Sequence, residues 1–99
     1  MKRIVWLKSA KLDLLDIHSY YTENASPQVA SRLLKRIHTS TSQLIDQPLM
    51  GVTRLDDDIL EWNIPDLSYT VPYQINGDDI EVLRVFHTAQ KKPSRWENE

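Results

Sequence analysis

The sequence contains no cysteine, only two glycines and a single phenylalanine. Without cysteine the chain has no disulfide, no thiolate metal ligand and no thiol nucleophile, which removes several classes of enzyme. It also lacks a long apolar run: the longest uncharged stretch, around residues 64–75, is interrupted by prolines and an aspartate. The apolar run near the N-terminus is too short for a signal peptide. We therefore expect a soluble, cytoplasmic chain with no membrane association.

A basic excess is also missing, since the net charge is -2 and the isoelectric point is near 5.9. Domains that hold a phosphate backbone usually carry clear positive charge, so we expect no sequence-specific nucleic-acid binding by the chain alone. His18 and His38 lack metal-ligand spacing, and we expect neither a metal nor a cofactor. Ninety-nine residues make one domain (1–99), with about 91–99 as a flexible tail.

The first half of the sequence predicts one strand and two helices. Residues 3–7 form a short β-type run, and Ser9 suits the N-cap of an amphipathic helix over residues 10–22. Ser26 and Pro27 then offer an N-cap and a first helical position for a second helix. Because the link between them is so short, the two helices are predicted to form an antiparallel hairpin.

Residues 69–87 predict a β-hairpin around Asn76-Gly77, a pair that supplies the positive φ angles of a tight turn. Whether the loop holds two or four residues, the same side chains share a face of the hairpin, because the two loop lengths differ by an even number. One face is predicted to carry Tyr69, Val71, Tyr73, Ile75, Ile80, Val82, Arg84 and Phe86, and the other Thr70, Pro72, Gln74, Glu81, Leu83, Val85 and His87. Arg84 and His87 should then point to opposite sides.

A further strand is predicted over residues 59–64 from its alternating pattern. The fold class is therefore α+β: an N-terminal strand and an α-helical hairpin packed on a three- to four-stranded antiparallel sheet. The helices cover one sheet face only. Because Leu83 and Val85 make the last strand apolar on its other side as well, we expect that uncovered face to receive a ligand or partner.

Several motifs, in their order and spacing, resemble the RelE/ParE toxins of bacterial type II toxin-antitoxin pairs, especially the ParE branch. The matching positions are Ala10, Asp13, Leu14, Ile17 and Tyr20, then Ala30 with Leu33 to Ile37, Pro48-x-Met50-Gly51, Glu61-Trp62-x-Ile64-Pro65, Tyr69, Tyr73 and the string from Ile80 to Gln90. The resemblance implies a helical hairpin on an antiparallel sheet. It also implies a growth-inhibiting toxin that is wrapped by the C-terminal segment of a cognate antitoxin in a hetero-oligomer.

Two targets occur among similar proteins: ParE-like members bind and inhibit DNA gyrase, whereas RelE-like members cleave messenger RNA on the ribosome. Here Pro65 stands where RNA-cleaving relatives carry an arginine, and Leu60 where many ParE-like chains carry one. We favour a gyrase-binding inhibitor without catalytic residues. The alternatives are a ribosome-dependent endoribonuclease that uses His87 and Arg54, and a non-toxic remnant that still binds antitoxin.

The chemistry and the position of a few residues predict their roles. Arg84, flanked by apolar neighbours, is predicted to form a structural ion pair with Asp13. His87 stands at a strand end, where it is either an acid/base group or a surface imidazole. The residues predicted to bind the target or partner are His87, Leu83, Val85 and, in the tail, Lys91, Lys92, Arg95 and Trp96.

Overall fold

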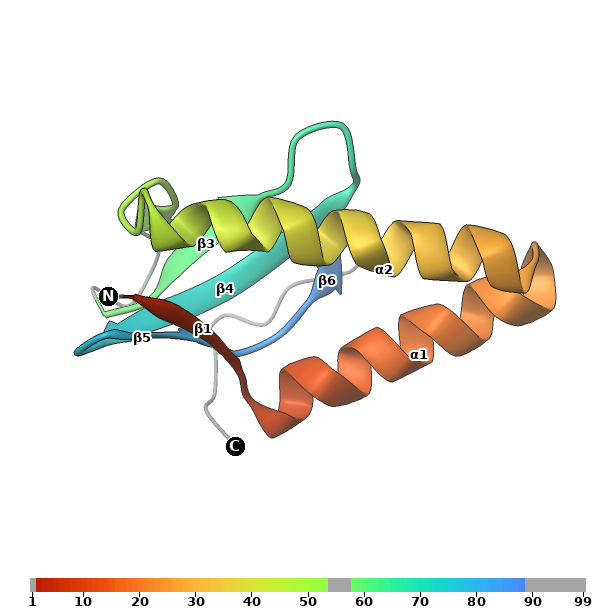
Figure 1. The fold of residues 1–99 in the computed structure, drawn as a ribbon, viewed down its shortest axis with the longest axis horizontal. Coiled ribbons are helices and arrows are strands. Elements are labelled where there is room, and N and C mark those ends of the chain that lie inside the picture. Colours follow the sequence, from red (N-terminus) through yellow and green to blue (C-terminus); the bar gives the residue numbers. More distant parts are fainter. Residues whose placement is uncertain (1, 54–57, 89–99) are drawn as a thin grey trace.

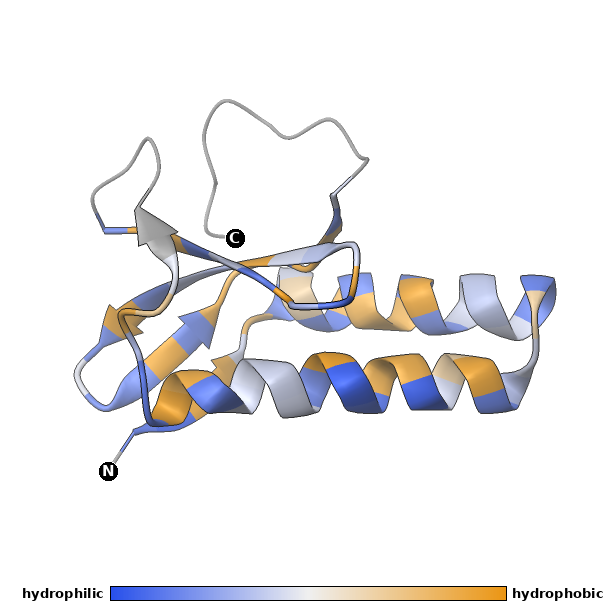
Figure 2. Ribbon diagram, turned by 90° about the horizontal axis from the view of Figure 1, so that it is seen from above, coloured by the Kyte–Doolittle hydropathy of each residue, from blue (hydrophilic) through white to orange (hydrophobic). Residues whose placement is uncertain are grey.

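The computed structural model describes residues 2–53 and 58–88. The elements are β1 (Arg3–Trp6), α1 (Lys8–Asn24), α2 (Pro27–Ser42), the 3-10 turn η1 (Gln43–Ile45), β2 (Val52–Thr53), β3 (Leu60–Asn63), β4 (Tyr69–Asn76), β5 (Asp79–Val82) and β6 (Phe86–His87). Figure 1 shows α1 and α2 as an antiparallel hairpin whose far end projects beyond the strands. Strands and helices form two layers, which confirms the α+β class. Figure 2 shows hydrophobic and hydrophilic residues alternating along both helices, as in amphipathic helices. Among the described helices, none has the length and apolar character needed to span a membrane.

The two helices begin for different reasons. α2 starts as predicted, because Ser26 Oγ accepts a hydrogen bond from Val29 N at 3.1 Å and Pro27 occupies the first turn. The predicted cap of α1 at Ser9 is wrong. The Leu7 carbonyl already accepts from Lys11 N at 3.0 Å, so the helix begins directly after β1 and buries Ser9 within its first turn.

The sheet has the strand order β1-β5-β4-β3-β2, with β6 beside β4. β1 runs parallel to β5, pairing Arg3 with Asp79 and Trp6 with Val82, whereas the other neighbours are antiparallel. The sheet is therefore mixed rather than antiparallel throughout. Its parallel pair is compatible with the long connection from β1 to β5, because parallel strands need a crossover of a dozen or more residues.

The hairpin between β4 and β5 forms where the sequence predicts it, but the prediction that Asn76 lies in its loop with a positive φ is wrong. Asn76 pairs with Asp79, which leaves Gly77 and Asp78 as a two-residue loop. Gly77 has a φ of 62°, the left-handed value that such tight turns require. The predicted parity holds over this stretch, since Ile75 faces Ile80 across the ladder.

Beyond the turn, the register between β4 and the chain that follows β5 shifts by one residue. Leu83 N still donates to the Pro72 carbonyl at 2.9 Å, in the register of β5. The next pair, however, joins Thr70 to Phe86. Residues 84–85 thus stand opposite a single residue of β4, which is the arrangement of a β-bulge. Because one extra residue reverses the alternation of side chains, the predicted faces are wrong from this point onward.

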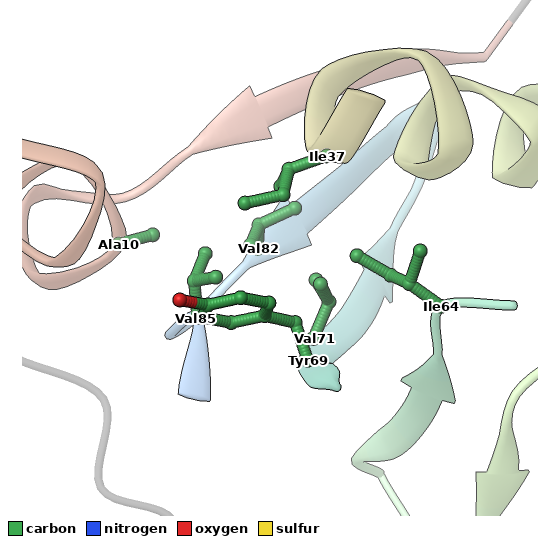
Figure 3. Close-up of a cluster of buried hydrophobic side chains, with 7 residues drawn as sticks. All are labelled: Ala10, Ile37, Ile64, Tyr69, Val71, Val82 and Val85. Atoms are coloured by element: carbon green, nitrogen blue, oxygen red, sulfur yellow. The ribbon is translucent and has the colours of Figure 1, made fainter. Parts of the chain in front are cut away.

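The bulge turns Val85 into the core beneath the helices. Figure 3 shows a cluster of seven buried side chains from both helices and the sheet: Ala10, Ile37, Ile64, Tyr69, Val71, Val82 and Val85. Val85 is 4% exposed, and Leu83, before the bulge, is 2% exposed. Neither side chain offers an open apolar surface, so the structure does not support the prediction that these two residues bind a partner.

A second buried cluster lies near the opposite end of the sheet around Tyr73, Leu44 and Ile80. The Tyr73 hydroxyl donates to the Pro48 carbonyl at 2.6 Å and accepts from Gly51 N at 3.0 Å. Burial raises the pKa of Tyr73, which keeps this hydroxyl protonated and able to donate. One side chain of β4 therefore fixes the loop that follows the helical layer.

Candidate functional site

A cavity of about 510 Å³ lies between α1 and the bulged end of the sheet. α1 contributes carboxylates and tyrosines at its wall, and the strands contribute an aromatic cluster with one arginine and one histidine. The polar and aromatic residues that line the cavity are Asp13, Asp16, Tyr20, Tyr21, Tyr69, Arg84, Phe86 and His87. Since α1 residues 13, 16, 17 and 20 recur at helical spacing, one side of this helix forms a continuous wall.

Asp13 holds the bulge in place. Its carboxylate accepts two hydrogen bonds from the Arg84 guanidinium, Nε to Oδ2 at 2.8 Å and Nη2 to Oδ1 at 3.1 Å. Asp13 Oδ2 also accepts from Val85 N at 2.9 Å, a backbone group that the bulge removes from the ladder. A two-point pair of this kind fixes the position of the guanidinium. Arg84 and Asp13 thus form a structural ion pair in the cavity wall.

The bulge also brings Arg84 and His87 to the same cavity, although the sequence pattern placed them on opposite sides. Arg84 Cζ lies 4.7 Å from the centroid of the Phe86 ring. The His87 ring meets Tyr69 edge-on, with centroids 5.2 Å apart and an interplanar angle of 83°. The prediction that these two residues face apart is therefore wrong, because it assumed an unbroken strand.

Tyr69 is the most buried aromatic residue of the cavity, at 6% exposed. Burial is the main cause that raises the pKa of its hydroxyl, followed by a hydrogen bond with Tyr21. At neutral pH the group is therefore protonated. It can orient a bound molecule by hydrogen bonding, but it is not a base.

This raised pKa predicts a loss of stability in alkali. The unfolded chain ionises Tyr69 near its ordinary pKa of 10.0, whereas the folded protein keeps the neutral form to higher pH. Above pH 10 the unfolded state binds fewer protons, so stability falls as pH rises, with Tyr69 contributing up to about 1.4 kcal/mol per pH unit. Tyr69→Phe should therefore show a shallower decline in urea unfolding between about pH 9 and about pH 11.

Tyr20→Phe is the matched control, because Tyr20 lines the same cavity but is 59% exposed. It should flatten the alkaline decline less than Tyr69→Phe does, because Tyr20 is the smallest of the causes that raise the pKa of Tyr69. An equal flattening in both variants would mean that burial of Tyr69 is not the cause of the alkaline decline.

The charges at the cavity suit a binding site better than a phosphate-cleaving site. Asp13 and Asp16 place two carboxylates there, and the Arg84 guanidinium is engaged by the first of them. Cleavage of a phosphodiester instead needs cations arranged around the developing charge. Over residues 2–53 and 58–88, no three His, Asp or Glu side chains are grouped so as to hold a metal ion.

Five residues assigned from the sequence lie outside the described residues: Arg54, Lys91, Lys92, Arg95 and Trp96. The other histidines are away from the cavity. His38 stacks on Trp6 with centroids 6.0 Å apart, and His18 Nδ1 lies 3.4 Å from Thr22 Oγ1. The tyrosines of the cavity are not among the residues that the sequence predicts to bind a target or partner. The helical spacing of Asp13, Asp16 and Tyr20 was the signal that could have revealed a shared wall.

Comparisons with known proteins agree on a family. The model described as "ParE toxin of type II toxin-antitoxin system, parDE" matches residues 4–92. A Sinorhizobium fredii protein named "Putative toxin Y4kP" is 35% identical over 92 residues, which cover 93% of this chain and 94% of that protein. A solved chain of the "Chromosomal ParDE TA system from P. aeruginosa" matches with a TM-score of 0.78 and 19% identity, over 88% of this chain and 96% of that one. At this identity the structural likeness shows the fold alone.

Proposed function

Because the chain belongs to the ParE toxin family of type II toxin-antitoxin systems, we propose that it inhibits growth by binding DNA gyrase and is neutralised by a cognate antitoxin. The gyrase target is the one that the ParE-like resemblance implies. The antitoxin partner is the one that the family description and the ParDE system name. Under this proposal the chain acts by binding two proteins, gyrase and the antitoxin, and not by catalysis.

The observation that carries the proposal is the engagement of Arg84 by Asp13. With Asp16 beside them, the cavity presents a carboxylate, tyrosines and an imidazole rather than a set of cations. Tyrosines that expose part of a ring and a hydroxyl are favourable contact residues at protein interfaces. Such a cavity fits an apolar or basic side chain of a partner, and Tyr20, at 59% exposed, is its most accessible aromatic residue.

Supercoiling of relaxed plasmid by purified gyrase tests the target. We expect the chain to inhibit the reaction in a dose-dependent way, and Tyr20→Ala to weaken inhibition by roughly tenfold, as for an aromatic anchor at an interface. Leu49→Ala is the control: Leu49 is 75% exposed, does not line this cavity and should inhibit like wild type. Full supercoiling in an excess of toxin would remove gyrase as the target. Undiminished growth on induced expression would favour the non-toxic remnant.

A ribosome-dependent endoribonuclease is the second candidate, because the bulge brings Arg84 and His87 to one cavity. In that reaction His87 would transfer a proton at the scissile phosphate. Primer extension on translated message separates the two candidates. Codon-dependent breaks that disappear in His87→Ala would favour the nuclease, whereas intact message together with inhibited gyrase would favour binding.

A further inference from the structure

α2 and the 3-10 turn η1 that follows it carry basic side chains but no acidic ones. Residues 27–45 contain Arg32, Lys35 and Arg36 but neither aspartate nor glutamate. All three side chains belong to exposed residues, and among the described residues none of them forms an ion pair. The chain as a whole is acidic, so this concentration of cations is a local feature of α2.

Two of these cations line a groove of about 370 Å³ between α2 and the loop that follows β3. The helical wall is formed by Lys35, Arg36, Thr39, Ser40 and Gln43. These positions recur every three or four residues, so they lie along one face over successive turns. The opposite wall is apolar at Ile64 and Pro65 and ends at Asp66.

The hydroxyl groups of this helix divide into two kinds. Thr41 Oγ1 donates to the Ile37 carbonyl at 2.8 Å, and Ser42 Oγ donates to the His38 carbonyl at 2.9 Å, so both are satisfied within their own helix. Thr39 and Ser40, which line the groove, form no side-chain hydrogen bond within the described part of the chain. The groove therefore offers two available hydroxyls beside two available cations.

We propose that this groove binds an acidic segment of a partner protein. Carboxylates spaced three or four residues apart on a partner helix would meet Lys35 and Arg36 and then the hydroxyl groups one turn later. An apolar side chain between the carboxylates would rest on Pro65, which is exposed, whereas Ile64 is buried behind it. This surface lies on a different set of residues from the α1 cavity, and the inference does not depend on gyrase being the target.

A protein segment fits better than nucleic acid. Affinity for duplex DNA depends on neutralising several phosphates, and α2 supplies only Arg32, Lys35 and Arg36. Asp66 at the groove wall would repel a continuous phosphate backbone, whereas a peptide can place its two or three carboxylates away from it. Asp66 is held in the left-handed region with a φ of 65°, so its position in the wall is set by the turn.

The test is an NMR titration of the ¹⁵N-labelled full chain with an amphipathic helical peptide that carries glutamates at i and i+4 and leucines between them. We expect shifts in the amides of residues 35–43 and of Ile64 and Asp66, since Pro65 has no N–H. The double variant Lys35→Gln/Arg36→Gln should weaken binding by roughly tenfold, since it removes both cations of the groove. Arg32→Gln is the matched control: it removes one cation of the same helix that does not line the groove, and should change affinity by less than about twofold.

Three results would overturn the proposal. The first is equal binding of a peptide with glutamine in place of glutamate. The second is an equal loss of affinity in Arg32→Gln and in the double variant. The third is tighter binding of a duplex oligonucleotide than of the acidic peptide at the same residues. Because the substituted side chains are exposed, an unchanged amide spectrum of each free variant verifies the fold. The titration does not involve gyrase, so a failure of the chain to inhibit gyrase would not change its result.

Discussion

Replacing Asp13 by alanine is expected to lower the free energy of unfolding by roughly 3 kcal/mol, because one carboxylate accepts three hydrogen bonds. The largest share should come from Val85 N, since Val85 is buried and its amide would have no replacement partner. The share of Arg84 should be smaller, because its side chain is 34% exposed and can turn to water. Urea unfolding followed by circular dichroism measures the difference.

Asp13→Asn should fall between wild type and Asp13→Ala, because the amide oxygen can still accept from Val85 N while the charge is lost. Asp16→Ala is the matched control. This carboxylate lines the same cavity one helical turn later without a hydrogen bond among the described residues, and its removal should cost less than about 0.5 kcal/mol. Similar losses at positions 13 and 16 would show that the bulge does not depend on this carboxylate.

Gly51→Ala is expected to destabilise the fold by roughly 3 kcal/mol through overpacking. An added Cβ would lie 2.7 Å from Tyr73 Oη, 2.8 Å from Tyr73 Cε1 and 2.9 Å from the Glu61 carbonyl oxygen. The Tyr73 ring is fully buried and tied to Pro48, and the Glu61 oxygen belongs to the backbone of β3, so neither can easily move away. Thermal unfolding should show the melting temperature of the variant falling by well over ten degrees, by the ordinary scaling for a domain of this size.

Gly77→Asn provides the contrast. Gly77 has a positive φ, but a Cβ added there would meet nothing within 4 Å. Asparagine tolerates this conformation, so the substitution should cost less than about 1 kcal/mol. A melting temperature for Gly51→Ala as high as that of Gly77→Asn would mean that the loop from Pro48 to Gly51 can move away from Tyr73.

The elements predicted correctly from the sequence are those whose structure is determined by contacts between near neighbours in the chain. Ser26 and Pro27 cap and start a helix through atoms within one turn, and Gly77 closes a hairpin within the four residues 76–79. The helical hairpin followed from the short link between two amphipathic segments. In each case the contacts that decide the structure are near neighbours in sequence, so the pattern of residue types is sufficient.

The bulge could not be predicted in the same way. Val85 N is satisfied by Asp13, a residue 72 positions away, and nothing in the last strand itself signals an extra residue. The errors about Val85, Arg84 and His87 follow from this contact. It reversed the faces of Val85 and His87 and joined Arg84 to His87 in one cavity. Similarly, the parallel pairing of β1 depends on where the helical hairpin returns the chain, which local alternation does not encode.

The parallel pairing also constrains when the chain can fold during synthesis. β1 is made before all the other strands described here, yet its neighbour in the sheet is β5 (Asp79–Val82). Lys2 Nζ further donates to the Gly77 carbonyl at 3.1 Å, across 75 positions. Until β5 has emerged from the ribosome, β1 has no strand to pair with. A newly made molecule therefore cannot complete its sheet before β5 is free, and until then it cannot present a finished binding surface.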